Sequence, residues 1–156
     1  MAARRPSKIN TVAEALVEKL RTISAKLDHP NWLTNPRTIK RGFGFSDSWA
    51  GATPAILLSV AAWSSVPKVA PFHQATVRFE IHLIVEDPGT PSGEDLLNSL
   101  ASDVIRLVQR NEVLDGLVET LYAESYELNV EAIQRSGKAV ATLIATAQFE
   151  YDHNTP

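Results

Sequence analysis

Residues Ala75 to Val85, ATVRFEIHLIV, alternate apolar and polar side chains along almost their whole length. Successive side chains of a β-strand point to opposite faces of the sheet, so this period of two predicts a strand with one buried face. The apolar side chains of that face are Val77, Phe79, Ile81, Leu83 and Val85. The polar side chains of the other face are Thr76, Arg78, Glu80 and His82. What this polar face contacts is the functional question that the sequence poses.

Residues 12–27 and 96–108 repeat apolar side chains at helical spacing, which predicts two amphipathic helices. Thr11 and Glu14 have the spacing of a capping box at the start of the first helix, and Pro30 ends it. The second helix follows a turn rich in Pro and Gly, and it is expected to cover the sheet.

Further segments of the chain are predicted to be strands. The apolar run PAILLSVAAW at residues 54–63 is short and bounded by breakers, as a buried strand is. Residues 120–134 and 138–152 form a predicted hairpin with a Ser-Gly turn, and residues 38–46 contribute a short strand to an irregular connection. These elements predict an α+β fold, with an antiparallel or mixed sheet of about four to five strands and two helices packed on one face.

A chain of 156 residues with 44% apolar content is long enough for one core, which predicts a single domain. We expect a flexible arm at residues 1–10, one α+β domain at residues 11–151 and a tail at residues 152–156. The net charge of -3 and the pI near 5.8 argue against a dedicated nucleic-acid-binding protein. The absence of cysteine excludes disulfides and thiolate metal sites.

The apolar run from Ala55 to Trp63 is too short to span a bilayer, and residues 1–10 lack the apolar stretch of a secretion signal. We therefore expect no contact with a membrane and a cytoplasmic origin.

Motifs that could carry catalysis are all incomplete. GFSDS approaches a nucleophile elbow around Ser46, but its last position is not Gly and no apolar strand precedes it. GFGFSD has Asp47 where a dinucleotide loop needs Gly or Ala. Glu80 and His82 share one strand face, but a metal site needs more convergent ligands than this pair. We therefore expect no enzymatic activity, no cofactor and no metal.

Trp32 and Trp49 lie in the irregular connection that precedes residue 54. Either they fold back onto the edge of the sheet or they anchor a partner, because aromatic side chains are enriched at the centres of interfaces. Phe43 and Phe45 lie close to Trp49 in the sequence, so these three aromatics together are a predicted anchor.

The order of these segments resembles that of the tail terminator, or tail-completion, proteins of long-tailed bacteriophages. The resemblance extends over nearly the whole chain. It comprises the leading helix TVAEALVEKLRTISAKL, the strands PAILLSVAAW and TVRFEIHLIVED, the helix GEDLLNSLASDVIRLVQ and a closing hairpin that ends in ATLIATAQFEYD.

Proteins of this family form a hexameric ring on the last ring of the tail tube, and they have no enzymatic activity. The ring halts polymerisation of the tube and presents a joining surface to the connector of the head. The resemblance therefore implies a structural virion protein at the head-proximal end of the tail, assembled in the host cytoplasm. Its implied partners are other copies of itself, the tail-tube protein and the connector or neck protein, with genomic DNA only as passing cargo.

In such a ring, Arg78, Glu80 and His82 are expected to lie at a subunit interface or to line the lumen. The anchor formed by Phe43, Phe45 and Trp49 is expected to contact a neighbouring subunit. The side chains expected to contact the adjoining ring are Asp87, Thr90, Ser92 and Glu94. The alternatives are another head-to-tail joining protein, such as a stopper or neck component, and a small α+β enzyme with a site around Glu80 and His82.

Overall fold

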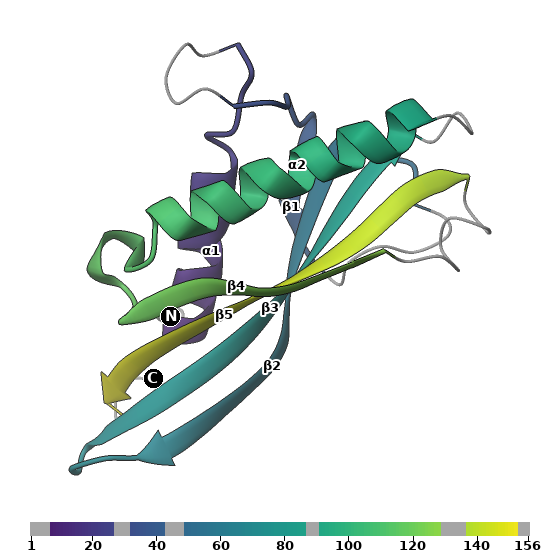
Figure 1. The fold of residues 1–156 in the computed structure, drawn as a ribbon. Coiled ribbons are helices and arrows are strands. Elements are labelled where there is room, and N and C mark those ends of the chain that lie inside the picture. Colours follow the sequence, from purple (N-terminus) through teal and green to yellow (C-terminus); the bar gives the residue numbers. More distant parts are fainter. Residues whose placement is uncertain (1–6, 27–31, 43–48, 87–90, 129–136, 153–156) are drawn as a thin grey trace, which may run out of the picture.

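The computed structural model describes residues 7–26, 32–42, 49–86, 91–128 and 137–152. The elements in chain order are α1 (Lys8–Leu20), β1 (Thr38–Arg41), β2 (Ala55–Pro67), β3 (Phe72–Glu86), α2 (Pro91–Arg110), a short 3-10 turn (Leu114–Gly116), β4 (Thr120–Leu128) and β5 (Lys138–Asp152) (Figure 1).

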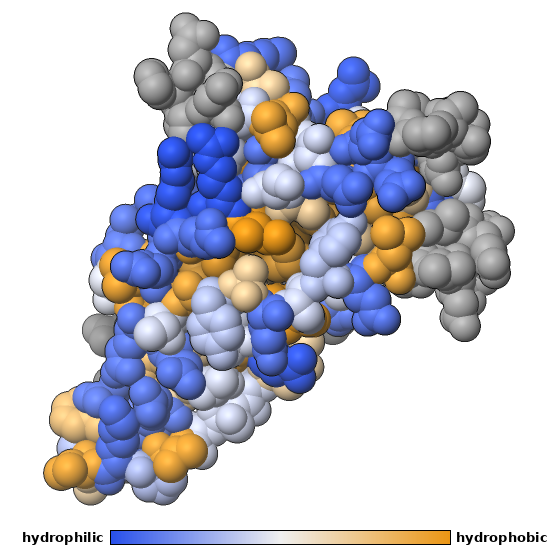
Figure 2. All heavy atoms as spheres, viewed as in Figure 1, coloured by the Kyte–Doolittle hydropathy of each residue, from blue (hydrophilic) through white to orange (hydrophobic). Residues whose placement is uncertain are grey.

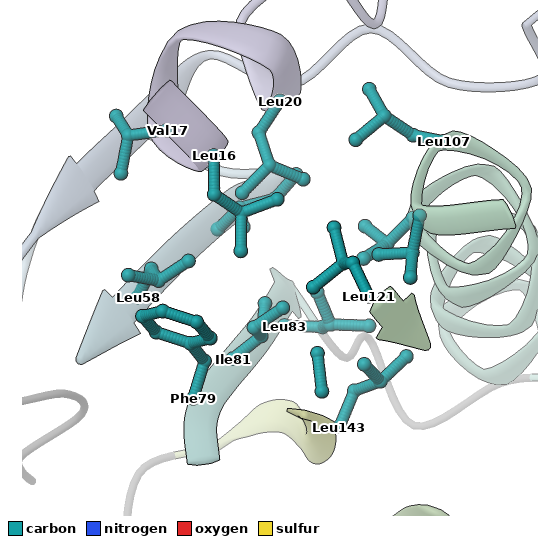
Figure 3. Close-up of a cluster of buried hydrophobic side chains, with 14 of the residues drawn as sticks. Leu16, Val17, Leu20, Leu58, Phe79, Ile81, Leu83, Leu107, Leu121 and Leu143 are labelled. Atoms are coloured by element: carbon teal, nitrogen blue, oxygen red, sulfur yellow. The ribbon is translucent and has the colours of Figure 1, made fainter. Parts of the chain in front are cut away.

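The strands form one five-stranded sheet in the order β1-β2-β3-β5-β4. β1 runs parallel to β2, and the other three neighbouring pairs are antiparallel. Both helices pack on the same face of the sheet, because buried side chains of α1 and α2 share one core with those of β2, β3, β4 and β5 (Figure 3). The predicted α+β class, with a mixed sheet and two helices on one face, is confirmed.

β3 lies at the centre of the sheet and is paired with β5 along its whole length and with β2 from His73 to Ile84. Phe79, Ile81 and Leu83 point into the core beneath the helices, and none of them is exposed to solvent (Figure 3). The alternation predicted from the sequence is therefore confirmed. It divides the sheet into a helix face, which carries these residues, and an open face, which carries the alternate residues of each strand.

β2 is buried in its first part only. Ala55 to Leu58 are buried, whereas every residue from Ala61 to Pro67 is exposed. The prediction of a buried strand over residues 54–63 is therefore wrong for its second half. The reason is that the β2–β3 hairpin extends beyond the helices, as Figure 1 shows.

α1 begins earlier than the capping-box pattern predicts. Ser7 is the N-cap, and its side chain accepts a hydrogen bond from the backbone amide of Asn10 at 3.2 Å. The Thr11 hydroxyl instead donates to the Ser7 carbonyl inside the first turn, at 3.2 Å. The start predicted at Thr11 is therefore wrong, and residues 8–10 of the expected arm are helical. The helix ends at Leu20, and Pro30 lies outside the described residues.

The segment that follows α1 is attached to α2 by a buried carboxylate. Asp103 is 1% exposed and accepts hydrogen bonds from the backbone amides of Leu33, at 3.0 and 3.1 Å, and Thr34, at 2.8 Å. The Thr34 hydroxyl donates a further bond at 2.5 Å. A buried carboxylate is stable when several donors satisfy it, so this contact fixes the path of the chain.

Trp32 packs on α2 next to this carboxylate. Its ring is 5% exposed and lies beneath the guanidinium groups of Arg106 and Arg110, at 5.3 and 5.8 Å from the ring centroid. Trp32 therefore folds back onto the domain, as one of the two sequence hypotheses holds, but onto a helix and not onto the edge of the sheet.

Asp103→Ala should reduce the free energy of unfolding by about 2–3 kcal/mol, because it leaves buried backbone and hydroxyl donors without an acceptor. Urea unfolding followed by circular dichroism measures this change. The matched control is Asp95→Ala, an exposed carboxylate of the same helix, for which the loss should stay below about 1 kcal/mol. Equal losses in the two variants would show that Asp103 does not hold the 32–35 segment.

Candidate functional site

The open face of the sheet is the candidate functional surface, because the described helices leave it uncovered. Cross-strand pairing places the following residues on the central part of this face: Leu57, Ser59, Ala62, Ser64, Thr76, Arg78, Glu80, His82, Thr120, Tyr122, Ser125, Glu127, Thr142, Ile144, Thr146 and Gln148. Most of these side chains are small hydroxyls or polar groups, and the charged ones are few. The structure therefore brings Arg78, Glu80 and His82 together on one surface, as the alternation predicts.

Glu124 joins this surface through an irregularity that the sequence does not reveal. The pairing of β4 with β5 skips one residue between Ala123 and Ser125, so Glu124 forms a bulge. Its Oε2 accepts a hydrogen bond from the Thr146 hydroxyl at 3.0 Å and lies 3.6 Å from Arg78 Nε. Arg78 therefore has a carboxylate partner within its own chain.

The His82 side chain is more enclosed than its ionisable neighbours Glu80 and Arg78 on the open face. Its Nε2 lies 3.7 Å from Glu80 Oε1, and its Nδ1 lies 3.3 Å from the Thr142 hydroxyl. Burial lowers the pKa of His82, and the nearby Glu80 carboxylate only partly offsets this effect. The imidazole is therefore mainly neutral at pH 7.

Trp49 covers one end of the open face. Its half-buried ring packs on a small apolar cluster formed by Ala55, Leu57, Ile84 and Val140. It therefore folds back onto a face of the sheet and not onto its edge. Phe43 and Phe45, the other two members of the predicted anchor, lie outside the described residues.

Of the four residues predicted to contact an adjoining ring, the two that the structure describes lie on α2, away from the open face. Ser92 and Glu94 belong to the first turn of α2, where Glu94 is exposed. Glu94 also faces Tyr126 of β4, whose pKa is raised by burial and, to a smaller extent, by the Glu94 carboxylate. Asp87 and Thr90 lie outside the described residues.

An apolar groove of about 380 Å³ lies on the helix face, between the start of α1 and the outer parts of β2 and β5. Val60, Trp63, Phe149 and Tyr151 line it, together with Lys8 and Arg41. Arg41 is held by Glu14 at 3.0 Å and Asn10 at 2.6 Å, and the Lys8 ammonium lies 5.8 Å from the centre of the Phe149 ring. This groove and the Glu80–His82 pair lie on opposite faces of the sheet, so the two do not form one site.

Within the residues that the structure describes, no cluster of three or more His, Asp or Glu side chains could hold a metal ion. No described helix has the length and apolar content needed to cross a bilayer. Comparison with models of known protein families gave no match, and a search of curated proteins found no significant relative.

The outer half of the β2–β3 hairpin is a feature that the sequence analysis missed. Its large exposed apolar side chains are Trp63 (57% exposed), Val66 (62%), Val69 (82%) and Phe72 (43%). Apolar side chains are visible at this projecting end of the molecule in Figure 2. The available signal was the stretch AAWSSVP at residues 61–67, which contains no charged residue.

Because folding lowers the pKa of His82 from its usual 6.5, the unfolded chain takes up this proton more readily than the folded chain. The resulting stabilisation is present above pH 6.5 and is lost as the pH falls through the lower pKa of the folded state. His82→Gln should therefore lose less stability than the unsubstituted protein between pH 7.5 and 5.0.

Urea midpoints measured at several pH values test this prediction. Ser59→Ala is the matched control, because it changes the same face without removing a titratable group, and it should keep the pH dependence of the unsubstituted protein. An unchanged pH dependence in His82→Gln would contradict the assignment.

Proposed function

We propose that this protein is a structural virion protein of a long-tailed bacteriophage that forms a ring, with six subunits, on the end of the tail tube. The ring ends polymerisation of the tube and provides the surface that joins the tail to the head connector. The proposal starts from the family resemblance of the segment order. The observation that supports it best is the sheet itself, on which the described helices cover one face and leave a broad polar surface on the other.

The charge of the open face suits the lumen of such a ring. Its central described part carries one cation, Arg78 (+1), and three carboxylates, Glu80, Glu124 and Glu127 (-3), while His82 is mainly neutral at pH 7. The sum is +1 - 3 = -2. Cationic side chains bind phosphates and release counterions, so a surface that DNA must pass without sticking should have no excess of them.

The contacts that these charged groups make also support a position in the lumen. Arg78, the cation of this part of the face, lies next to the Glu124 carboxylate, and Glu80 lies next to the mainly neutral His82. A cation that is already paired with a carboxylate binds a phosphate group only weakly. We infer that the open face lines the channel and that the helix face lies on the outside of the ring.

The oligomeric state tests the proposed function directly. Light scattering across a concentration series should show a species of six subunits, either for the protein alone or after addition of the tail-tube protein of the same virion. A species that binds the head connector and ignores the tube would identify a neck component. A monomer or dimer that ignores both proteins would overturn the proposal.

Reversing the charge of the open face should create DNA binding without changing the ring. In Glu80→Lys/Glu127→Lys the described central charge changes from -2 to +2, because each substitution adds two units. We expect the ring to keep its mass and to bind duplex DNA with an affinity that falls steeply as salt rises.

The matched control for this experiment is Glu18→Lys/Asp95→Lys, which makes the same change of charge at exposed positions of the two helices. If the control variant binds DNA as tightly as Glu80→Lys/Glu127→Lys, the open face does not line the channel.

A further inference from the structure

Among the described residues, the outer edge of β2 has no neighbouring strand over most of its length. β1 pairs only with Ala55 to Leu58, and no described strand lies beside the rest of β2 on that side. Ala61 to Pro67 are all exposed. This stretch therefore presents a row of backbone donors and acceptors to its surroundings.

The sequence of this edge does not protect it. Exposed edges are usually guarded by charged side chains, above all Lys, by proline or by bulges that twist the strand away. Here the irregularity lies at Ala61, the first residue of the exposed stretch. Ala62 to Val66 beyond it have no charged residue, no proline and no further break in the pairing, and proline occurs only at the last residue, Pro67. Trp63 and Val66 add exposed apolar area, on the helix face and the open face respectively. Such an edge is expected to be covered by another strand.

The opposite edge of the same sheet is β4, which pairs only with β5 among the described strands. It also carries one large exposed apolar side chain on each face: Tyr122 (47% exposed) on the open face and Leu128 (40%) on the helix face. The β2 edge of one subunit could therefore pair with the β4 edge of the next in a head-to-tail contact. Repeated head-to-tail contacts generate a ring when the rotation from subunit to subunit closes.

We propose that residues Ala62–Pro67 of β2 pair with β4 of a second copy, so that the sheet continues from subunit to subunit around the ring. The inference rests on the proposed function and identifies the surface through which the copies associate. Strand directions alternate from β2 through β3 and β5 to β4, so neighbours related by the axis of a ring bring β2 and β4 together antiparallel. The open faces of all subunits then turn toward the channel.

The matching of faces restricts the register of this pairing. One register that uses the whole edge places Val66 beside Tyr122 and Ser64 beside Ser125, with all four side chains on the open face. A shift by two residues keeps the faces matched, whereas a shift by one places each side chain on the wrong face.

The absence of cysteine in this chain allows a clean test by crosslinking. Ser64→Cys is mixed with Tyr122→Cys, Ser125→Cys or Glu127→Cys, and the mixture is oxidised with diamide, alone and with the tail-tube protein. Directly opposed residues bring their Cβ atoms to about 4.5–5.5 Å, close to disulfide geometry. Within one chain β2 and β4 are separated by β3 and β5, roughly 14 Å at the usual strand spacing, so an intrachain disulfide is excluded.

We expect a crosslinked dimer of Ser64→Cys with at least one β4 variant, and no such product with Ser102→Cys, an exposed position of α2. A chain that carries both Ser64→Cys and the matching β4 cysteine should give a ladder of products that ends at six. Crosslinking of Ser64→Cys only with itself would indicate a symmetric β2–β2 dimer and would overturn the pairing.

The experiment also separates the two proposals. A six-subunit ring that gives no crosslink between β2 and β4 would overturn the edge pairing and leave the ring function intact. A protein that stays monomeric with and without the tube protein, and gives no crosslink, would overturn both.

A second variant tests the edge without oxidation. Ser64→Lys/Val66→Lys introduces the charges that normally guard an exposed edge, at positions that are solvent-exposed in the single chain. Association should weaken at least about tenfold while the urea midpoint of the monomer is unchanged. Asn98→Lys/Ser102→Lys, on the exposed surface of α2, is the matched control and should associate like the unsubstituted protein. Unchanged association in Ser64→Lys/Val66→Lys would contradict the edge pairing.

Discussion

The burial of one face of β3 is the constraint on which the rest of the structure depends. β3 is paired with β5 over its full length and with β2 from His73 to Ile84. The apolar residues of its helix face therefore fix the face on which β2 and β5 present theirs. α1 and α2 then have one surface to cover, and both pack on it. A shift of one residue would exchange the two faces of the strand, which makes the register strongly specified. The alternate residues of β3 are polar and necessarily point to the other side of the sheet, where they form the open face.

Element lengths explain why part of the sheet projects beyond the core. β3 has 15 residues and spans roughly 50 Å, whereas α1 has 13 residues and α2 has 20, which correspond to roughly 20 and 30 Å. The helices therefore cannot cover the whole hairpin of β2 and β3, and its outer half lies beyond them (Figure 1). The Asp103 carboxylate holds the segment after α1 against α2, so this segment does not cover the hairpin either. The described part of the chain therefore leaves a strand edge of β2 uncovered, which is a surface suited to assembly.

The sequence predicted the features that depend on local periodicity. The alternation of β3 and the apolar stripe of α2 are regular over many residues, and both elements form as predicted. The features that it missed depend on contacts between distant residues. Asp103 has its partner Leu33 at a separation of 70 residues, the bulge at Glu124 becomes visible only through pairing with β5, and β1 joins the sheet parallel to β2. On the candidate surface, the alternation correctly grouped Arg78, Glu80 and His82, whereas the unpaired edge of β2 depends on where β1 ends.

In the proposed assembly, the sheet becomes continuous from subunit to subunit around a ring, its polar face lies toward the channel, and the ring ends the tail tube. The length of tail tubes grown with and without this protein, seen by negative-stain electron microscopy, is the most direct test of that function. The account predicts that tubes of the same virion's tube protein stop growing when the protein is added, with extra density at one end of each tube. Tubes that keep growing to the same lengths, with bare ends, would contradict it.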